Sequence, residues 1–214
     1  MDPATGLWIH GWEFDGETSG HGFARALWGR GNCWVSQMFS YTNVMMIKLT
    51  YQITLAIPMF FELVQLPPTD PTYRILISAL TRQVDALLPL QDPESGLWRT
   101  LLVDSTSYVE VSATAGFVGG ILKAIRSVRY SPSQLSRVDH QGLLPQEKYL
   151  KPAIDGLKGC LAVVQPNGAV AHVSKGTPVG RTVDFYKHIP RYPVPYGQSL
   201  VIVALVEWLR QASS

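Results

Sequence analysis

The residues best suited to chemistry lie together between Trp28 and Trp34, in the sequence Trp-Gly-Arg-Gly-Asn-Cys-Trp. The guanidinium of Arg30 is planar and can bind a carboxylate through two parallel hydrogen bonds. The two indole rings offer flat apolar faces of the kind that stack on a sugar ring, and Asn32 can add an amide hydrogen bond. These residues are therefore candidates for a sugar or anion pocket. The alternative is that both tryptophans are core residues and that Arg30 is paired with an acid.

Two further residues are candidates for the same pocket. Glu110 precedes an apolar helical segment, where a carboxylate is favoured by the helix dipole and often serves only as a cap. Both roles, cap and pocket contact, remain open for Glu110. His10 lies between two tryptophans in the first conspicuous motif of the chain, whereas the other four histidines are scattered.

The composition argues against several other classes of protein. The 214 residues carry a formal net charge of +2 and no run of lysine or arginine, so we expect neither a nucleic acid nor a membrane as partner. The longest apolar run, from Leu200 to Val206, is too short to cross a membrane. Cys33 and Cys160 lie far apart without metal-ligand spacing, so the sequence predicts no disulfide framework, no metal site and no cofactor.

Three turns of similar sequence divide the chain. Asp2 to Trp8 reads Asp-Pro-Ala-Thr-Gly-Leu-Trp, Asp92 to Trp98 reads Asp-Pro-Glu-Ser-Gly-Leu-Trp, and a weaker copy runs from Gln165 to Val170. Each copy predicts a turn that leads into a short extended piece. Such self-similarity indicates a repeated unit, here a pair of helices between successive turns. Because a domain seldom begins with a turn, we expect the natural protein to have further chain before Met1.

Each predicted helix pair has an outer and an inner member. The outer helix begins with Asp70 as N-cap and Pro71 as its first residue. Its apolar face consists of Ile75, Leu76, Ala79, Leu80, Val84, Leu87 and Leu88. The inner segments, Ala113 to Ile125 and Leu200 to Leu209, are apolar on nearly every side, which predicts burial all round. Repeated outer and inner helices predict an all-α toroid whose ligand pocket lies where the N-termini of the inner helices converge.

Several motifs resemble, in the same order, those of glycoside hydrolase family 105. They are Gly6 to Trp12, Trp28 to Trp34, Glu110 to Ala113, and Gly176 to Gly180 with Asp184 to Tyr186. This family of unsaturated rhamnogalacturonyl hydrolases shares an (α/α)6 barrel with the unsaturated glucuronyl hydrolases of family 88. The resemblance implies that residues 1–214 form a single all-α domain, an incomplete (α/α)6 barrel that corresponds to the C-terminal part of the family fold.

The resemblance also implies a substrate and a reaction. The substrate is an oligosaccharide, derived from pectin or rhamnogalacturonan, whose non-reducing end is a 4,5-unsaturated uronic acid. An aspartic acid protonates the vinyl ether, water adds to the ring, and the resulting hemiketal opens and releases the remaining sugar. By this resemblance His10, Arg30 and Trp34 line the uronate subsite, and Trp28 and Asn32 either line it or support it. The catalytic aspartate would lie upstream of Met1, so we expect this chain to be an inactive fragment.

Two other functions remain open from the sequence. The first is hydrolysis of unsaturated glucuronyl oligosaccharides, because no residue reports on the sugar beyond the uronate. The second is a non-catalytic carbohydrate-binding protein with the same helical toroid.

Residues 35–52 interrupt the resemblance and are predicted to be a non-native insertion. Their apolar residues form no helical face. Val35-Ser36 can be encoded by GTAAGT and the last four residues by an element that ends in CAG, as in a retained intron. Without these 18 residues the spacing from Gly6 to Gly96 falls from 90 to 72, which equals the spacing from Gly96 to Gly168. Residues 128–141 are a second, weaker candidate, because their removal would spoil that equality.

Overall fold

A computed structural model describes residues 2–9, 26–33, 53–64, 66–67, 69–126, 143–176 and 182–213. Over these ranges the chain is helical, with isolated β-bridges but no strand. The helices are α1 (Gly29–Cys33), α2 (Ile53–Val64), α3 (Pro71–Leu87), the 3-10 helix η1 (Leu88–Leu90), α4 (Val111–Arg126), α5 (Gln146–Ala162), α6 (Val183–Lys187) and α7 (Pro195–Ala212). The prediction of an all-α fold is confirmed for this part of the chain.

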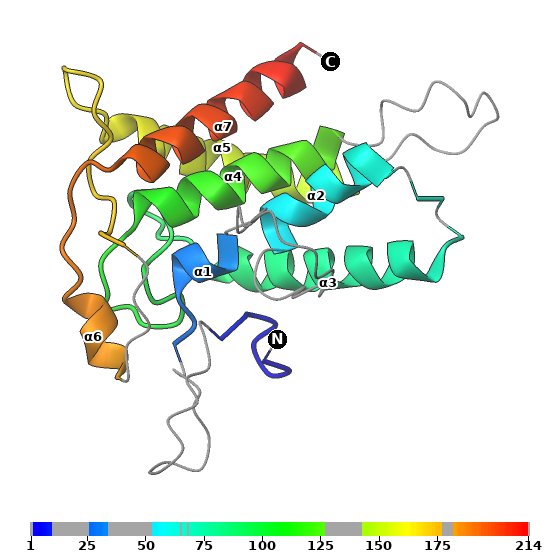
Figure 1. Cartoon of the computed structure of the whole chain (residues 1–214), viewed down its shortest axis with the longest axis horizontal. Coiled ribbons are helices and arrows are strands. Elements are labelled where there is room, and N and C mark those ends of the chain that lie inside the picture. The colour runs from blue at the N-terminus through cyan, green and yellow to red at the C-terminus, as the bar shows by residue number, and fades with distance from the viewer. Residues whose placement is uncertain are drawn as a thin grey trace, which may run out of the picture.

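Helix α4 is the centre of the fold. All 16 of its residues are buried, and it packs against α1, α2, α5 and α7; in Figure 1 it lies between α7 and α2. Its glycines allow close approach, because a Cβ on Gly116 would lie 2.7 Å from the Cβ of Cys33, and a Cβ on Gly120 would lie 2.1 Å from the carbonyl oxygen of Thr54. The prediction of a helix over residues 113–125 that is buried on every side is confirmed.

Helix α3 begins as predicted but differs from the prediction on one face. Asp70 is the N-cap, and its side chain accepts a hydrogen bond from the backbone N–H of Thr72 at 2.7 Å. Leu80 is fully buried, whereas Ile75, predicted on the same face, is 68% exposed. The two residues are five positions apart, which at 3.6 residues per turn places them about 140° apart around the helix. Ile75 therefore lies outside the buried stripe.

Helix α7 also departs from the prediction, which was wrong about its burial. Residues 200–209 were expected to be buried nearly all round, yet Ile202 is 52% and Leu209 is 63% exposed. The buried side carries Val201 and Ala204 and packs against α4 and α5. No helix that the structure describes covers the opposite side of α7. An apolar sequence alone does not show which neighbours are present to cover it.

The three repeated turns share one backbone geometry, which confirms the prediction of a turn in each of these segments. Gly6, Gly96 and Gly168 have φ values of +72°, +71° and +82°, a region that glycine enters at little steric cost. In the first two turns the side chain of the leading aspartate, Asp2 or Asp92, accepts hydrogen bonds from the residue three positions later.

Each turn is attached to a later helix in the same way. The backbone N–H two residues after the glycine donates to the side chain of the fourth residue of α1, α4 or α7, respectively. The bonds are Trp8 N–H to Asn32 Oδ1 at 2.8 Å, Trp98 N–H to Thr114 Oγ1 at 2.9 Å and Val170 N–H to Gln198 Oε1 at 3.1 Å. These bonds place α1, α4 and α7 equivalently with respect to their turns. The second residue of each helix is consequently directed to the same end of the fold.

Near the C-terminal ends of α2, α4 and α7, a cluster of ion pairs joins these three helices. Glu207 of α7 accepts hydrogen bonds from Arg126 at 2.7 Å and from Lys123 at 3.4 Å. Glu62 of α2 pairs with the same two α4 cations, and Arg210 lies 3.2 Å from Glu207. The cluster thus fixes the C-terminal ends of three helices relative to one another.

Some predictions fall outside the described residues. These are the two predicted insertions, residues 35–52 and 128–141, and the site candidates His10 and Trp34. Within the described ranges, no helix is both long enough and apolar enough to span a lipid bilayer.

Candidate functional site

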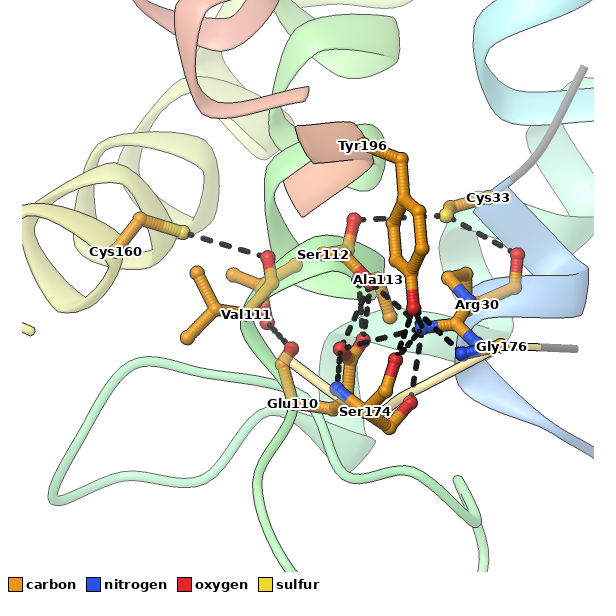
Figure 2. A network of polar contacts seen from close by, with 11 residues as sticks. Arg30, Cys33, Glu110, Val111, Ser112, Ala113, Cys160, Ser174, Gly176 and Tyr196 are labelled. Carbon is orange, nitrogen blue, oxygen red and sulfur yellow. Dashed lines mark hydrogen bonds and ion pairs between the residues drawn. The ribbon is translucent and has the colours of Figure 1, made fainter. Parts of the chain in front are cut away.

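The N-terminal ends of α1, α4 and α7 meet around a single arginine, as Figure 2 shows from close by. The second residue of each helix takes part: Arg30 in α1, Ser112 in α4 and Tyr196 in α7. Ser174 joins them from the extended segment that precedes α6. Segments far apart in the sequence therefore build one polar centre.

Arg30 is fully buried at this centre. Its Nη1 donates to the carbonyl oxygen and the hydroxyl of Ser174, at 2.5 and 2.9 Å. Longer bonds run from the same nitrogen to the hydroxyls of Ser112, at 3.4 Å, and Tyr196, at 3.3 Å. The carboxylate of Glu110 lies 3.8 Å from Nη1. One nitrogen of the guanidinium is thus held from several sides.

Two aromatic rings enclose the same guanidinium. The Cζ atom of Arg30 lies 4.5 Å from the ring centroid of Trp28 and 4.8 Å from that of Tyr196. Cation–π contacts of this kind favour the charged group and restrict its rotation. The arginine is therefore fixed in orientation as well as in position.

The other edge of Arg30 is formed by Nε and Nη2. Nε and Nη2 are buried and have no hydrogen-bond partner among the described residues. These adjacent nitrogens are the pair of parallel donors that grips a carboxylate in a bidentate contact. A buried charged donor without a partner costs free energy. An anionic group that reached this edge would remove that cost.

Glu110 supports the site from the N-terminus of α4. It is fully buried, and its carboxylate accepts hydrogen bonds from the Ser112 hydroxyl at 2.7 Å, the Ala113 N–H at 2.6 Å and the Ser174 N–H at 3.0 Å. Glu110 is therefore the N-cap of α4 and also ties the segment around Ser174 to that helix. Its contact with a ligand stays a prediction.

The geometry gives Asn32 and Trp28 supporting contacts. The amide of Asn32 accepts from the backbone N–H of Trp8 and donates to the carbonyl oxygens of Trp8 and Trp28. The Asn32 residue is only 1% exposed. Trp28 is also buried, and its ring centroid lies 6.2 Å from that of Tyr186. Direct contact of either residue with a sugar stays a prediction.

Sequence reasoning did not single out Ser174 or Tyr196. A signal for Tyr196 existed, because it occupies the same helix position as Arg30 and Ser112. Aligning the starts of the inner helices would have identified it. Ser174 carries no comparable signal, since it lies in an extended segment whose position depends on tertiary contacts.

The two cysteines are poorly suited to act as nucleophiles. Burial, together with the nearby Glu110 charge, raises the pKa of the Cys33 thiol well above its usual value. Burial likewise raises the pKa of Cys160. Both thiols therefore remain protonated at neutral pH. In the described ranges no three His, Cys, Asp or Glu side chains lie close enough together to hold a metal ion.

Comparison with known proteins defines the class as glycoside hydrolases. A family model of Glycosyl Hydrolase Family 88 matches residues 1–212. The chain belongs to this family, and the match covers nearly all of its length. The resemblance to families 105 and 88 expected from the motifs is confirmed.

Individual relatives agree with this assignment. The chain is 30% identical over 211 residues to the unsaturated rhamnogalacturonyl hydrolase YesR of Bacillus subtilis (strain 168), covering 98% of this chain and 48% of YesR. Two crystal structures described as a possible member of the GH105 family are each 40% identical to it. The one from Klebsiella pneumoniae has a TM-score of 0.78 and the one from Salmonella enterica 0.76; each match covers 99% of this chain and 46% of the other. The chain thus spans about half the length of these relatives.

Proposed function

We propose that this chain is the uronate-binding part of a glycoside hydrolase that acts on unsaturated uronyl oligosaccharides from pectin or rhamnogalacturonan. The observation that carries the proposal is the Nε–Nη2 edge of Arg30, which has no hydrogen-bond partner within the described part of the chain. This edge is buried, fixed between two aromatic rings and matched in geometry to a carboxylate. The name of YesR, an unsaturated rhamnogalacturonyl hydrolase, supports the substrate class.

In this proposal the fold is an incomplete (α/α)6 barrel formed by residues 1–214 as a single domain. Helices α1, α4 and α7 are inner members, and α3 and α5 are outer members. The repeated turns support this arrangement, as does the equivalent placement of the three inner helices. The exposed apolar side of α7 is where a further helix of a complete ring would pack.

The proposed reaction is hydration of the vinyl ether of the unsaturated uronate, which needs a positioned general acid. General acid catalysis contributes roughly 10² to 10⁴ in rate. Among the described residues, Glu110 is the carboxylate that lies at the site, and both of its oxygens already accept hydrogen bonds. We therefore propose that this chain by itself binds the substrate but does not turn it over.

The nearest alternative substrate is an unsaturated glucuronyl oligosaccharide, on which the unsaturated glucuronyl hydrolases of family 88 act. The 4,5 double bond removes the stereocentre at C4 that distinguishes glucuronate from galacturonate. Arg30 would consequently bind the terminal ring of either substrate equally well. A non-catalytic carbohydrate-binding protein would use the same contact with the uronate. Turnover of the substrate by a longer protein that contains this chain would distinguish a hydrolase from such a binding protein.

Calorimetric titration with the unsaturated rhamnogalacturonan disaccharide tests the proposal. Arg30→Lys keeps the charge but loses the fork, so binding should weaken by about 1.5 to 3 kcal/mol, the range for hydrogen bonds to charged groups. The control is Arg74→Lys, at an exposed position of α3, which should bind as the unchanged chain does. Equal affinity of Arg30→Lys and the control would remove Arg30 from the site.

The same samples test the absence of turnover. The conjugated enol of the substrate absorbs in the ultraviolet, and this absorbance is lost on hydration. We expect the absorbance to fall no faster with the purified chain than in buffer alone. Steady loss that Glu110→Gln abolishes would show that Glu110 is the general acid.

A further inference from the structure

The hydroxyl of Tyr196 connects the arginine to the extended segment beside it. It donates to the carbonyl oxygen of Ser174 and accepts from the N–H of Gly176 at 2.8 Å. It also accepts from Arg30 Nη1 at 3.3 Å, and the Tyr196 ring covers one face of the guanidinium. A single side chain thus contacts both the arginine and the backbone that holds Nη1.

We infer that Tyr196 is a positioning residue that determines which edge of Arg30 meets the ligand. The inference rests on the proposed function, because it assumes a carboxylate at that edge. A guanidinium has two edges for bidentate binding, Nε with Nη2 and Nη1 with Nη2. Ser174 and Tyr196 occupy Nη1, so only the Nε–Nη2 edge is available to the ligand.

The two parts of the tyrosine have separate tasks. The ring, like that of Trp28, contacts the guanidinium and limits its rotation. The hydroxyl keeps the Ser174 carbonyl oxygen directed at Nη1. Without the hydroxyl, the Ser174 carbonyl oxygen loses one of its donors and Nη1 loses one of its acceptors, so Nη1 is held less firmly and competes more readily for the ligand. The arginine then keeps its charge but loses its preferred edge.

Tyr196→Phe and Tyr196→Leu separate these tasks, with Tyr73→Phe on α3 as the control for loss of a tyrosine hydroxyl elsewhere. The measured quantity is the ratio of two dissociation constants, for the unsaturated rhamnogalacturonan disaccharide and for its uronate methyl ester. This ratio reports recognition of the carboxylate specifically. A merely structural role would weaken both ligands in proportion and lower the thermal midpoint.

We expect Tyr196→Phe to reduce the preference for the free acid about fivefold and Tyr196→Leu to reduce it further, while Tyr73→Phe leaves it unchanged. An unchanged ratio in Tyr196→Phe would overturn the positioning role. Loss of both ligands in proportion would overturn it too. If the unchanged chain itself showed no preference for the acid, the proposed function would fail instead.

A second, independent observation concerns α1 and α2, which both pack along α4 (Figure 1). Their contacts follow α4 in order from its N-terminus to its C-terminus. Arg30 contacts Ser112, Cys33 contacts Gly116, Thr54 contacts Gly120, and Glu62 pairs with Lys123 and Arg126. Both short helices therefore run in the same direction as α4 and pack against successive parts of it.

The geometry points to α1 and α2 being two parts of one inner helix into which residues 35–52 are inserted. Gly116 and Gly120 are four positions apart, or about 6 Å along α4. Without residues 35–52, Cys33 and Thr54 would be three positions apart, which is about one helical turn. The five residues of α1, Trp34 and the twelve of α2 would then form a helix of 18 residues, the length of α7.

Deletion of residues 35–52 tests this inference. The continuous helix should form, because both parts already lie on α4, and closing an 18-residue loop would no longer cost entropy. We expect more helix by circular dichroism and a thermal midpoint raised by about 5 °C or more. Deleting only residues 37–52 is the matched control, because the two extra residues would turn α2 by about 200° and direct its buried face away from α4.

A midpoint raised by the first deletion and not by the second would support the inserted helix. Equal effects of the two deletions, or loss of folding in the first alone, would overturn it.

Discussion

The ion pairs between α2, α4 and α7 allow a stability prediction with a defined magnitude. Glu207 is only 4% exposed, and its partners Lys123 and Arg126 are 5% and 7% exposed. Glu207→Gln removes the negative charge and leaves both cations buried, with Glu62 as the remaining carboxylate beside them among the described residues. Removing one partner from a buried pair typically costs about 3 to 5 kcal/mol. Because Glu62 remains, we expect about 3 kcal/mol, at the lower end of this range.

Urea unfolding followed by circular dichroism measures this loss. A change of about 3 kcal/mol corresponds to a thermal midpoint lowered by about 6 to 12 °C in a protein of this size. Glu94→Gln is the matched control, because Glu94 lies exposed in a turn and makes no ion pair among the described residues. This variant should change the free energy of unfolding by less than about 0.5 kcal/mol. Equal shifts in the two variants would refute the argument that the cluster holds α2, α4 and α7 together.

Two further predictions concern other contacts. Gly120→Ala should destabilise the fold by about 1 to 3 kcal/mol, because its Cβ would meet the backbone of α2 at 2.1 Å. Gly119→Ala is the control and should cost less in the same urea assay, because its nearest contact would be a side-chain methyl group at 3.3 Å. The pKa of Asp104 is lowered to about 2, chiefly by a hydrogen bond from Lys187. This contact therefore stabilises the fold fully above pH 3.8, and its contribution is lost as the pH falls through about 2. Lys187→Met should raise the pKa of Asp104 towards 3.8 in a carboxyl NMR titration, and an unchanged titration curve would contradict the assignment.

The sequence predicted those elements whose signals are local. Asp70 and Pro71 mark the start of α3 because capping depends on neighbouring residues. The repeated turns were recognisable because a positive φ requires glycine at one fixed position. The burial of α4 followed from an apolar sequence that contains small residues. The cap and the turns are determined within a few residues of the chain, whereas the burial of α4 also depends on the helices packed around it.

Features that depend on distant neighbours were not predicted. The exposure of Ile202 and Leu209 depends on which helices are present beside α7. For the site, Arg30 was identified by its residue type and its aromatic neighbours. Ser174, which holds it, is 144 residues away in the chain and contributes a backbone carbonyl that no residue type reveals. Sequence therefore identified the charged group of the site but not the contacts that orient it.

The central claim, that the Nε–Nη2 edge of Arg30 binds a uronate carboxylate, is tested most directly by the NMR signal of the Arg30 Nε–H. Arg30→Lys assigns this signal, because it alone should disappear in that variant. Titration with the unsaturated rhamnogalacturonan disaccharide should shift the signal downfield to saturation, as expected for a new charge-assisted hydrogen bond, whereas the uronate methyl ester should shift it far less. A disaccharide that binds while the Nε–H signal stays in place, or equal shifts with acid and ester, would contradict the account.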